Sequence, residues 1–331
     1  MNWPGSTQVV AGRFSVVVPS FQQGEFLERT LRSILDQDYG DVEIIVQDGG
    51  STDQSLGILK RYGSRLRWES KRDNGQTAAI NEGMRKATGE FLGYLNSDDV
   101  LCAGALRRVA ACFASHHGID ILYGQAEFID EQDRVLGDYP TEEWNYTRLL
   151  DTCFICQPAC FWRRSVMERH GLFDESMRYS MDYEYWLRVG ATTPFYFFRE
   201  KLAHSRCHAR AKSFDQPGMA LRDTVAMMQR YHNGRIPPRW IIGYARDCAE
   251  QQLRKGGTPP VRWTRFAFSY WRNLQALAPK VTPGGAAVLL RKLGPPYPSA
   301  CRRLRDPLSC LKMAPVAETS QRTNSQASAL P

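Results

Sequence analysis

The chain has 331 residues, of which 43% are apolar and 24% are charged, and this composition excludes a small disulfide-stabilised protein and a wholly disordered one. Its net charge of +8 is unevenly distributed, because residues 1–213 carry −4 and residues 214–331 carry +12. We therefore predict two regions, of which the basic one suits a nucleic acid, an anionic membrane or an anionic substrate.

The sequence favours a cytoplasmic protein. Residues 1–13 do not combine basic residues with an apolar run, as a targeting peptide does, and no stretch approaches the ~18 apolar residues of a bilayer-spanning helix. Nine cysteines, an odd number, fit a reducing compartment. We interpret the cluster of Cys153, Cys156 and Cys160 as buried thiols rather than half of a zinc site, because no second ligand pair stands nearby.

The first hundred residues alternate strand patterns with helix patterns. Short apolar runs predict strands at 14–18, 42–46, 66–69 and 91–95. Apolar residues at helical spacing predict helices at 25–37, from 51 or 52 to about 61, and around 79–84. Strands joined by helices indicate a parallel, doubly wound sheet, whose ligands bind beyond the carboxyl ends of the strands.

Acidic residues follow two of these strands. Asp98 and Asp99 end an apolar run, where two adjacent like charges are costly unless a cation such as Mg²⁺ or Mn²⁺ neutralises them. Alternatively they cap a helix that begins near Ala103. Asp48, after the second strand, is either a turn residue or an acceptor for a nucleobase N–H or a ribose hydroxyl.

Three familiar motifs are absent from the sequence. It has no Gly-x-Gly-x-x-Gly after the first strand, no Gly-x-x-x-x-Gly-Lys-Ser/Thr and no Gly-x-Ser-x-Gly. These absences argue against a dinucleotide oxidoreductase, a P-loop ATPase and an α/β-hydrolase.

A series of motifs resembles glycosyltransferase family 2. In order, they are Val18–Phe21, Gln47–Asp53, Asp73–Gly83, Thr88–Glu90, Leu95–Asp99, Gln157–Phe161, Gly171–Glu175, Met181–Arg188 and Arg206–Ser213. The resemblance covers about residues 14–213. It implies an α/β GT-A fold, in which a Rossmann-like, mostly parallel sheet is flanked by helices, and inverting, metal-dependent transfer from nucleotide-diphosphate sugars.

The resemblance also implies roles for individual residues. It places the nucleoside and phosphates of the donor against Pro19, Ser20, Phe21, Asp48, Asp73, Gln76, Ser97, Asp98 and Arg210. The metal would rest on Asp98, with Asp99 and His208 in support, because Asn96 replaces the first acid of the usual Asp-x-Asp. Arg210 or Lys212 would stabilise the diphosphate as it leaves.

Asp182 is the predicted catalytic base. It occupies the second position of the family's Glu-Asp pair, in which Met181 replaces the Glu. One carboxylate suffices when the leaving group is a metal-bound diphosphate. The alternative is that Asp182 caps the helix predicted at 183–189.

Residues 214–294 read as a basic, helical extension. Helices are predicted at 221–231, 240–253, 263–277 and 286–293, with tryptophans interleaved with arginines. This pattern favours docking on an anionic membrane surface, with plain packing or oligomerisation as the alternative. No nucleic-acid-binding motif supports a nucleic acid partner. Residues 295–331 are rich in Pro and Ser, and their end is expected to be disordered.

The predicted function is an inverting glycosyltransferase of bacterial-type surface polysaccharide or lipid-linked oligosaccharide synthesis, working in the cytoplasm or peripherally on the inner face of the cell membrane. The expected donor is a UDP sugar, with GDP and dTDP as alternatives, and the acceptor is a saccharide or a lipid-linked one. The rival hypothesis is a catalytically weak GT-A domain that binds a nucleotide or assembles a complex. A sugar nucleotidyltransferase is a further alternative, although its glycine-rich first loop is missing.

Overall fold

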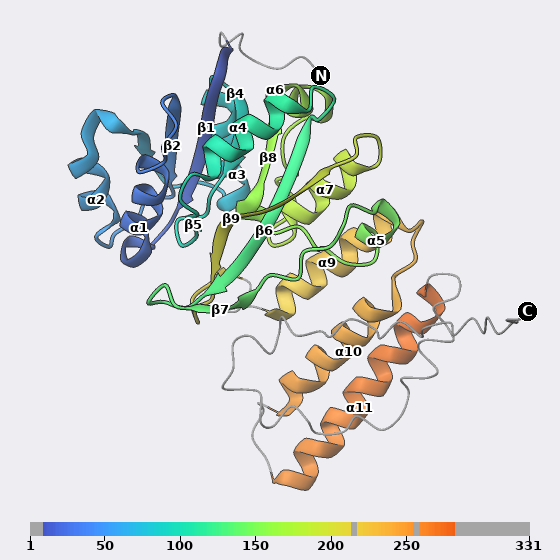
Figure 1. Ribbon diagram of the computed structural model, residues 1–331. Helices are drawn as coiled ribbons and strands as arrows, with labels where there is room; N and C mark the ends of the chain where they lie inside the picture. The colour runs from blue at the N-terminus through green and yellow to red at the C-terminus, as the bar shows by residue number, and fades with distance from the viewer. Residues whose placement is uncertain (1–8, 213–216, 254–257, 282–331) are drawn as a thin grey trace, which may run out of the picture. The chain divides into compact units, whose positions relative to one another are not determined.

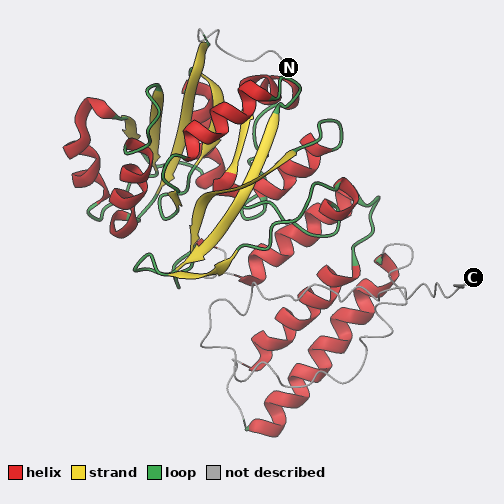
Figure 2. Ribbon diagram, viewed as in Figure 1, coloured by secondary structure: helices red, strands yellow, loops and turns green. Residues whose placement is uncertain are grey.

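A computed structural model describes residues 9–212, 217–253 and 258–281 (Figures 1 and 2). Within them, nine strands form one mixed sheet with the order β3-β2-β1-β4-β8-β6-β9-β5, and β7 pairs with β6 outside this path. Helices cover both faces of the sheet. The predicted α/β class is confirmed.

The first half of the sheet is parallel and alternates with helices, as predicted. Its elements are β1 (Val10–Ser20), α1 (Gly24–Leu35), β2 (Val42–Asp48), α2 (Ser55–Tyr62), a 3₁₀ turn (Gly63–Arg65), β3 (Arg67–Ser70), α3 (Gln76–Lys86) and β4 (Gly89–Tyr94). β1 lies between β2 and β4 and runs parallel to both, and β3 continues the sheet beyond β2.

The second half mixes strand directions. Its elements are β5 (Val100–Leu101), α4 (Ala105–Ser115), β6 (Ile121–Ile129), β7 (Val135–Asp138), α5 (Tyr146–Leu149), a 3₁₀ turn (Gln157–Ala159), β8 (Cys160–Arg163), α6 (Arg164–His170), α7 (Met181–Gly190) and β9 (Tyr196–Arg206). β8 runs antiparallel to β4 and β6, whereas β9 runs parallel to β6 and antiparallel to β5.

β1 shows why the sheet needs helices on both faces. Successive side chains of a strand point to opposite faces. Val17 packs in one core with residues of α3, α6 and α7, whereas Val16 and Val18 pack in another with residues of α1, α2 and α4. A strand buried on both sides reads as a continuous apolar run, and residues 14–18 have this pattern.

Three further helices follow: α9 (Pro217–Tyr231), α10 (Pro238–Leu253) and α11 (Pro259–Leu277), with a 3₁₀ turn at Ala278–Lys280. Each begins at a proline, a residue that the first helical turn tolerates because its N–H has no partner there. The helices predicted at 240–253 and 263–277 therefore begin two and four residues too late, because a proline can occupy the first turn of a helix. The helix predicted at 286–293 and the tail at 295–331 lie outside the described residues.

α9 packs with the first region, although it follows residue 213. Its Met227 and Met228 are fully buried in the same core as Trp186 of α7. At the start of α10, Trp240 Nε1 donates a hydrogen bond of 3.0 Å to the carbonyl of Asp151. The net charge of the sequence changes sign after residue 213, but α9 and the start of α10 still contact the elements that precede it. None of the described helices is long and apolar enough to cross a bilayer.

The contact between α3 and β1 gives a test of the packing. A Cβ atom on Gly83 of α3 would lie 2.4 Å from Cγ1 of Val17, which is buried in β1. We expect Gly83→Ala to destabilise the fold by about 1–3 kcal/mol, because the strand cannot move away. Gly57→Ala is the matched control. This exposed helical glycine has open space around it, so the change should stabilise by about 0.4–1 kcal/mol.

Urea unfolding of both variants measures the two free energies of unfolding. Equal effects of Gly83→Ala and Gly57→Ala would show that α3 and β1 do not approach as closely as described.

Candidate active site

The carboxyl ends of β1, β2 and β4 lie at one edge of the sheet, because these neighbouring strands run parallel. β1 ends at Ser20 beside Asp48, the last residue of β2. After β4 the chain continues through residues 95–99 to β5, and β9 brings residues 206–208 to the same place. We call this place the carboxyl edge.

Phe21, Gly49 and Asp73 lie together at the carboxyl edge. A Cβ atom on Gly49 would lie 3.2 Å from Phe21 Cδ2 and 3.1 Å from Asp73 Oδ2. Phe21 is 60% exposed, whereas Pro19 and Ser20 are buried, and the Ser20 hydroxyl has no hydrogen-bond partner in the described part of the chain. An exposed ring beside a carboxylate can stack on a base and accept a hydrogen bond from a ribose hydroxyl.

Asp48 holds the turn that follows β2. Its Oδ2 accepts hydrogen bonds from the N–H groups of Gly50 and Ser51 at 3.1 and 2.8 Å and from Ser70 Oγ at 2.6 Å. Its Oδ1 accepts one from Ser51 Oγ at 2.6 Å. Because Asp48 is only 2% exposed, a nucleobase would have to compete with these four donors.

Asp98 lies beside His208. His208 Nε2 is 3.0 Å from Asp98 Oδ2, and the imidazole packs on the Phe26 ring with centroids 4.6 Å apart. The Gln23 amide approaches the same oxygen at 3.4 Å. In the described residues, Asp98 Oδ1 makes no hydrogen bond and the buried His208 Nδ1 has no partner. Asp98 can therefore offer one oxygen to a ligand.

Asp99 is buried and points the other way. Its Oδ1 accepts the N–H of Arg206 at 2.8 Å, its Oδ2 accepts from Asn96 Nδ2 at 3.1 Å, and its carbonyl accepts from Thr30 Oγ1 at 2.7 Å. Burial, followed by the neighbouring charge of Asp98, raises the pKa of the Asp99 carboxyl. The capping alternative is wrong, since β5 intervenes and α4 begins after Gly104 without a side-chain cap.

The predicted set of three metal ligands does not converge. Nowhere in residues 9–212, 217–253 and 258–281 do three acidic, histidine or cysteine side chains gather as a metal site would require. Asp98 and His208 meet, whereas the oxygens of Asp99 are taken by protein donors. Any metal at this edge would depend on Asp98 and on ligands from outside the protein.

A chain of amides leads from Asp99 to Lys212. Asn96 Oδ1 accepts from Gln76 Nε2 at 2.7 Å, and Gln76 Oε1 accepts from Lys212 Nζ at 2.9 Å. Burial, together with the charge of Arg178, lowers the pKa of Lys212 to about 8. Arg210, the cation favoured from the sequence, is exposed and pairs with Glu25 of α1.

Asp182 is the second residue of α7, so Ser180 and not Asp182 is the helix N-cap. Its Oδ1 accepts the N–H of Tyr183 at 2.8 Å. Burial raises the pKa of Asp182, and this hydrogen bond and the charge of Lys212 oppose the shift. The charges of Asp182 and Asp99 both add to the burial that raises the pKa of Tyr94 at the end of β4. Asp182 therefore lies within electrostatic range of the carboxyl edge.

The comparisons with known proteins agree with this geometry. Residues 15–171 match the family model for glycosyl transferase family 2. The chain is 33% identical over 185 residues to a PGL/p-HBAD biosynthesis glycosyltransferase of Mycobacterium tuberculosis (strain ATCC 25177 / H37Ra), a match that covers 54% of this chain and 70% of the relative. This chain belongs to glycosyltransferase family 2. It is a glycosyltransferase.

More distant relatives share the family and the fold. An uncharacterized glycosyltransferase of Rickettsia prowazekii (strain Madrid E) is 26% identical over 208 residues, which cover 59% of this chain and 64% of that protein. The crystal structure of S. aureus TarS 1–349 in complex with UDP-GlcNAc superposes with a TM-score of 0.56 at 17% identity, over 81% of this chain and 84% of that one. At this identity the superposition establishes the GT-A fold alone.

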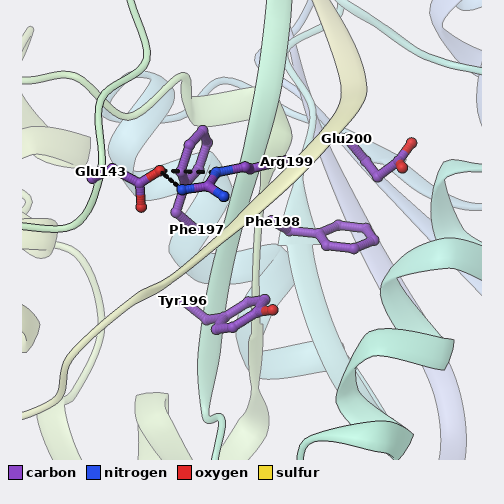
Figure 3. Close-up of a pocket in the computed structure, with 6 residues that line it drawn as sticks. All are labelled: Glu143, Tyr196, Phe197, Phe198, Arg199 and Glu200. Carbon is purple, nitrogen blue, oxygen red and sulfur yellow. Dashed lines mark hydrogen bonds and ion pairs between the residues drawn. The ribbon is translucent and has the colours of Figure 1, made fainter.

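A shallow hollow lies at the other end of β9 from His208 (Figure 3). It is lined by Glu143 and by residues 196–200 at the start of β9, and Arg199 Nε donates to Glu143 Oε1 at 2.9 Å. No predicted site residue lines this hollow. In the family 2 glycosyltransferase, the carboxyl edge is therefore the candidate active site.

Sequence reasoning missed two contacts at this edge. Gln157 Nε2 donates to the carbonyl of Tyr94 at 2.7 Å, and its Oε1 accepts from Asn96 Nδ2 at 3.3 Å. The Gln-Pro pair of its motif was the available signal. Lys212 was named only as an alternative to Arg210.

Ser97 is buried in the turn closed by the hydrogen bond from Asp99 N to Asn96 O.

The raised pKa of Asp182 predicts an unusual effect on stability. At neutral pH the folded enzyme carries a charge there that burial disfavours. We expect Asp182→Asn to raise Tm at pH 7, and the difference from wild type to vanish as pH falls below the ordinary carboxyl pKa, where Asp182 is neutral in both states. Calorimetry at several pH values measures this, and a lower Tm for Asp182→Asn at pH 7 would contradict it.

Proposed function

We propose that this glycosyltransferase is an inverting enzyme that moves a sugar from a nucleotide-diphosphate donor to an acceptor hydroxyl with the help of Mg²⁺ or Mn²⁺. One observation carries the proposal. Lys212 links the carboxyl edge, where Asp98 and His208 meet, to Asp182. Its Nζ donates a hydrogen bond to Gln76 at that edge, and its charge interacts with the Asp182 carboxylate. This arrangement supports a donor site with a proton acceptor close to it.

The residues present fit a divalent metal. Asp98 has one carboxylate oxygen without a protein donor, and Mg²⁺ or Mn²⁺ commonly takes one or two carboxylates together with phosphate oxygens of the substrate. His208, held against Phe26, fixes the other oxygen of Asp98. When bound, the metal would neutralise charge on the departing diphosphate.

Asp182 would act as the base. The acceptor oxygen attacks the anomeric carbon while Asp182 takes the hydroxyl proton, and the bond between that carbon and the diphosphate oxygen breaks with its electron pair going to the diphosphate. A single displacement inverts the anomeric configuration. The pKa of Asp182, raised by burial, makes the carboxylate a stronger base than an exposed one.

The donor and the pathway are the finer part of the proposal. We favour a UDP sugar, with GDP and dTDP sugars as alternatives. The exposed Phe21 ring beside Asp73 suits a base and a ribose in all three donors. The mycobacterial relatives are named for PGL/p-HBAD biosynthesis, which supports an acceptor that is lipid-linked. The product would be a surface polysaccharide or a lipid-linked oligosaccharide.

A donor screen tests the function. The purified chain is incubated with UDP, GDP and dTDP sugars, saccharide and lipid-linked acceptors, and Mg²⁺, Mn²⁺ or EDTA, while nucleotide release and glycosylated product are followed. Metal-dependent transfer by wild type and none by Asp182→Asn is expected. Nucleotide-sugar binding without transfer by wild type would favour the catalytically weak GT-A domain. Equal transfer by Asp182→Asn would show that Asp182 is not the base.

Lys212, rather than Arg210, should stabilise the leaving diphosphate. We expect Lys212→Met to lower kcat/KM about 100-fold, the usual cost of removing one group that stabilises transition-state charge. Arg210→Met is the matched control and should stay within about threefold of wild type, because an exposed ion pair contributes little. Comparable losses in the two variants would refute this assignment.

The pKa of Lys212 adds a test by pH. Because this pKa lies at about 8, the ammonium loses its charge as pH rises through that value, and kcat/KM of wild type should fall there. Lys212→Arg keeps its charge and should keep its activity at higher pH.

The exposed face of α11 suits an anionic membrane surface. This helix contains Arg262, Arg265 and Arg272 and neither Asp nor Glu, and its Phe268 is 68% exposed. Other residues of α11, among them Tyr270, pack in a separate small core with α10. Aromatic and basic side chains on one helix are typical of interfacial docking. We propose that the enzyme works peripherally at the inner face of the cell membrane.

Vesicle binding checks the docking surface. Phe268→Ser should weaken co-sedimentation with vesicles containing phosphatidylglycerol at least about tenfold, because a phenyl ring contributes roughly 1.5–3 kcal/mol when it leaves water. Gln275→Ser, at another exposed position on α11, is the control and should change nothing. Vesicle binding by wild type that does not depend on the anionic lipid would contradict the proposed docking on an anionic membrane.

A further inference from the structure

One carboxylate of α9 holds the backbone that leads into α7. Asp223 Oδ2 accepts hydrogen bonds from three successive N–H groups, those of Arg178 at 2.9 Å, Tyr179 at 2.7 Å and Ser180 at 3.4 Å. Three parallel donors around one anion fix the backbone more firmly than a single bond does. The segment 178–180 ends two residues before Asp182.

A second pair of side chains joins the same two elements. Ser180 is the N-cap of α7, yet its hydroxyl makes no cap bond. Instead it lies 2.6 Å from the hydroxyl of Thr224, and both residues are buried. The start of α7 is therefore held by α9, which replaces the usual local cap.

α9 is itself firmly anchored. Met227 and Met228 are fully buried, and the hydroxyl of Tyr231 donates to Glu184 Oε1 of α7 at 2.8 Å. The carboxylate of Asp223 is thus presented from a fixed element. Small shifts of its position would pass directly to the first turn of α7.

The same segment also faces Lys212. The Nζ atom of Lys212 lies 5.3 Å from the centroid of the Tyr179 ring. The backbone N–H of Tyr179 donates to Asp223. The ring is therefore placed by Asp223 as well. The Asp223 carboxylate thus stabilises both the segment that precedes Asp182 and the backbone of Tyr179, whose ring lies beside Lys212.

We propose that Asp223 is a positioning residue for Asp182: by fixing the backbone of residues 178–180, it sets the place from which the Asp182 carboxylate reaches the acceptor hydroxyl. This inference rests on the proposed function, in which Asp182 takes the proton. Asp223 itself touches no substrate in this scheme. It lies beyond residue 213, in the part of the chain that the charge distribution had set apart.

Three variants test the proposal. Asp223→Ala removes the acceptor, and Asp223→Asn keeps one acceptor oxygen without the charge. Arg230→Ala is the control, because it cuts a different contact between α9 and this part of the chain, the ion pair of Arg230 with Asp174 at 3.0 Å, and leaves the three N–H groups bound.

We expect Asp223→Ala to lower kcat about 100-fold, the cost of misplacing a reacting group by about 1 Å. The KM for the donor and the affinity for the nucleoside diphosphate should change much less than kcat, because Lys212 keeps its hydrogen bond to Gln76 when the Asp223 carboxylate is removed. Asp223→Asn should recover part of kcat, and Arg230→Ala should leave it within about threefold.

Amide hydrogen exchange gives a readout that needs no activity. Exchange at residues 178–182 should accelerate at least about tenfold in Asp223→Ala and stay unchanged in Arg230→Ala. Unchanged exchange in Asp223→Ala would overturn the proposal, whether or not the enzyme transfers a sugar. So would an equal loss of kcat in Arg230→Ala, or a loss in Asp223→Ala that merely follows the folded fraction. Absence of transfer by wild type would instead overturn the proposed function.

Discussion

The hydrogen bond from the N–H of Arg206 to the buried carboxylate of Asp99 joins two parts of the chain that are 107 residues apart. It ties the turn after β4 to the end of β9. With that bond in place, Asp98 and His208 face each other at 3.0 Å, although each follows a different strand. The Arg206 guanidinium adds a second tie, since its Nε donates to the carbonyl of Asp98 at 2.7 Å. The half of the site that contains Asp98 and His208 depends on this junction.

The parallel half of the sheet could be predicted because local patterns determine it. A run such as residues 14–18 is apolar on both faces, and the residues after it must then stand at the carboxyl ends of the strands. The same reasoning placed Asp48 and Asp98 correctly along the chain. It did not show that Asp99 turns inward, because the partners of Asp99 come from α1, the turn at Asn96 and β9.

The division of the chain by charge was less informative than its packing. Charge at the surface says little about which helices share a core, and α9 joins the core of α7 through two methionines. The sequence left Arg210 and Lys212 as alternatives for a similar reason. Both are basic residues of one motif, and only the fold shows that Glu25 of α1 pairs with Arg210 while Gln76 accepts from Lys212.

The aspartates around the site differ in what their oxygens bind. In Asp48 and Asp99 both carboxylate oxygens accept hydrogen bonds from protein donors. Asp53 likewise accepts the N–H groups of Gly24 and Ser55 on its two oxygens. Such carboxylates hold turns and strand ends. Asp98 and Asp182 each keep one oxygen without a donor in the described residues. An oxygen in that state can bind a cation or a proton, so the acids that hold turns and strand ends differ from the two to which we assign chemistry.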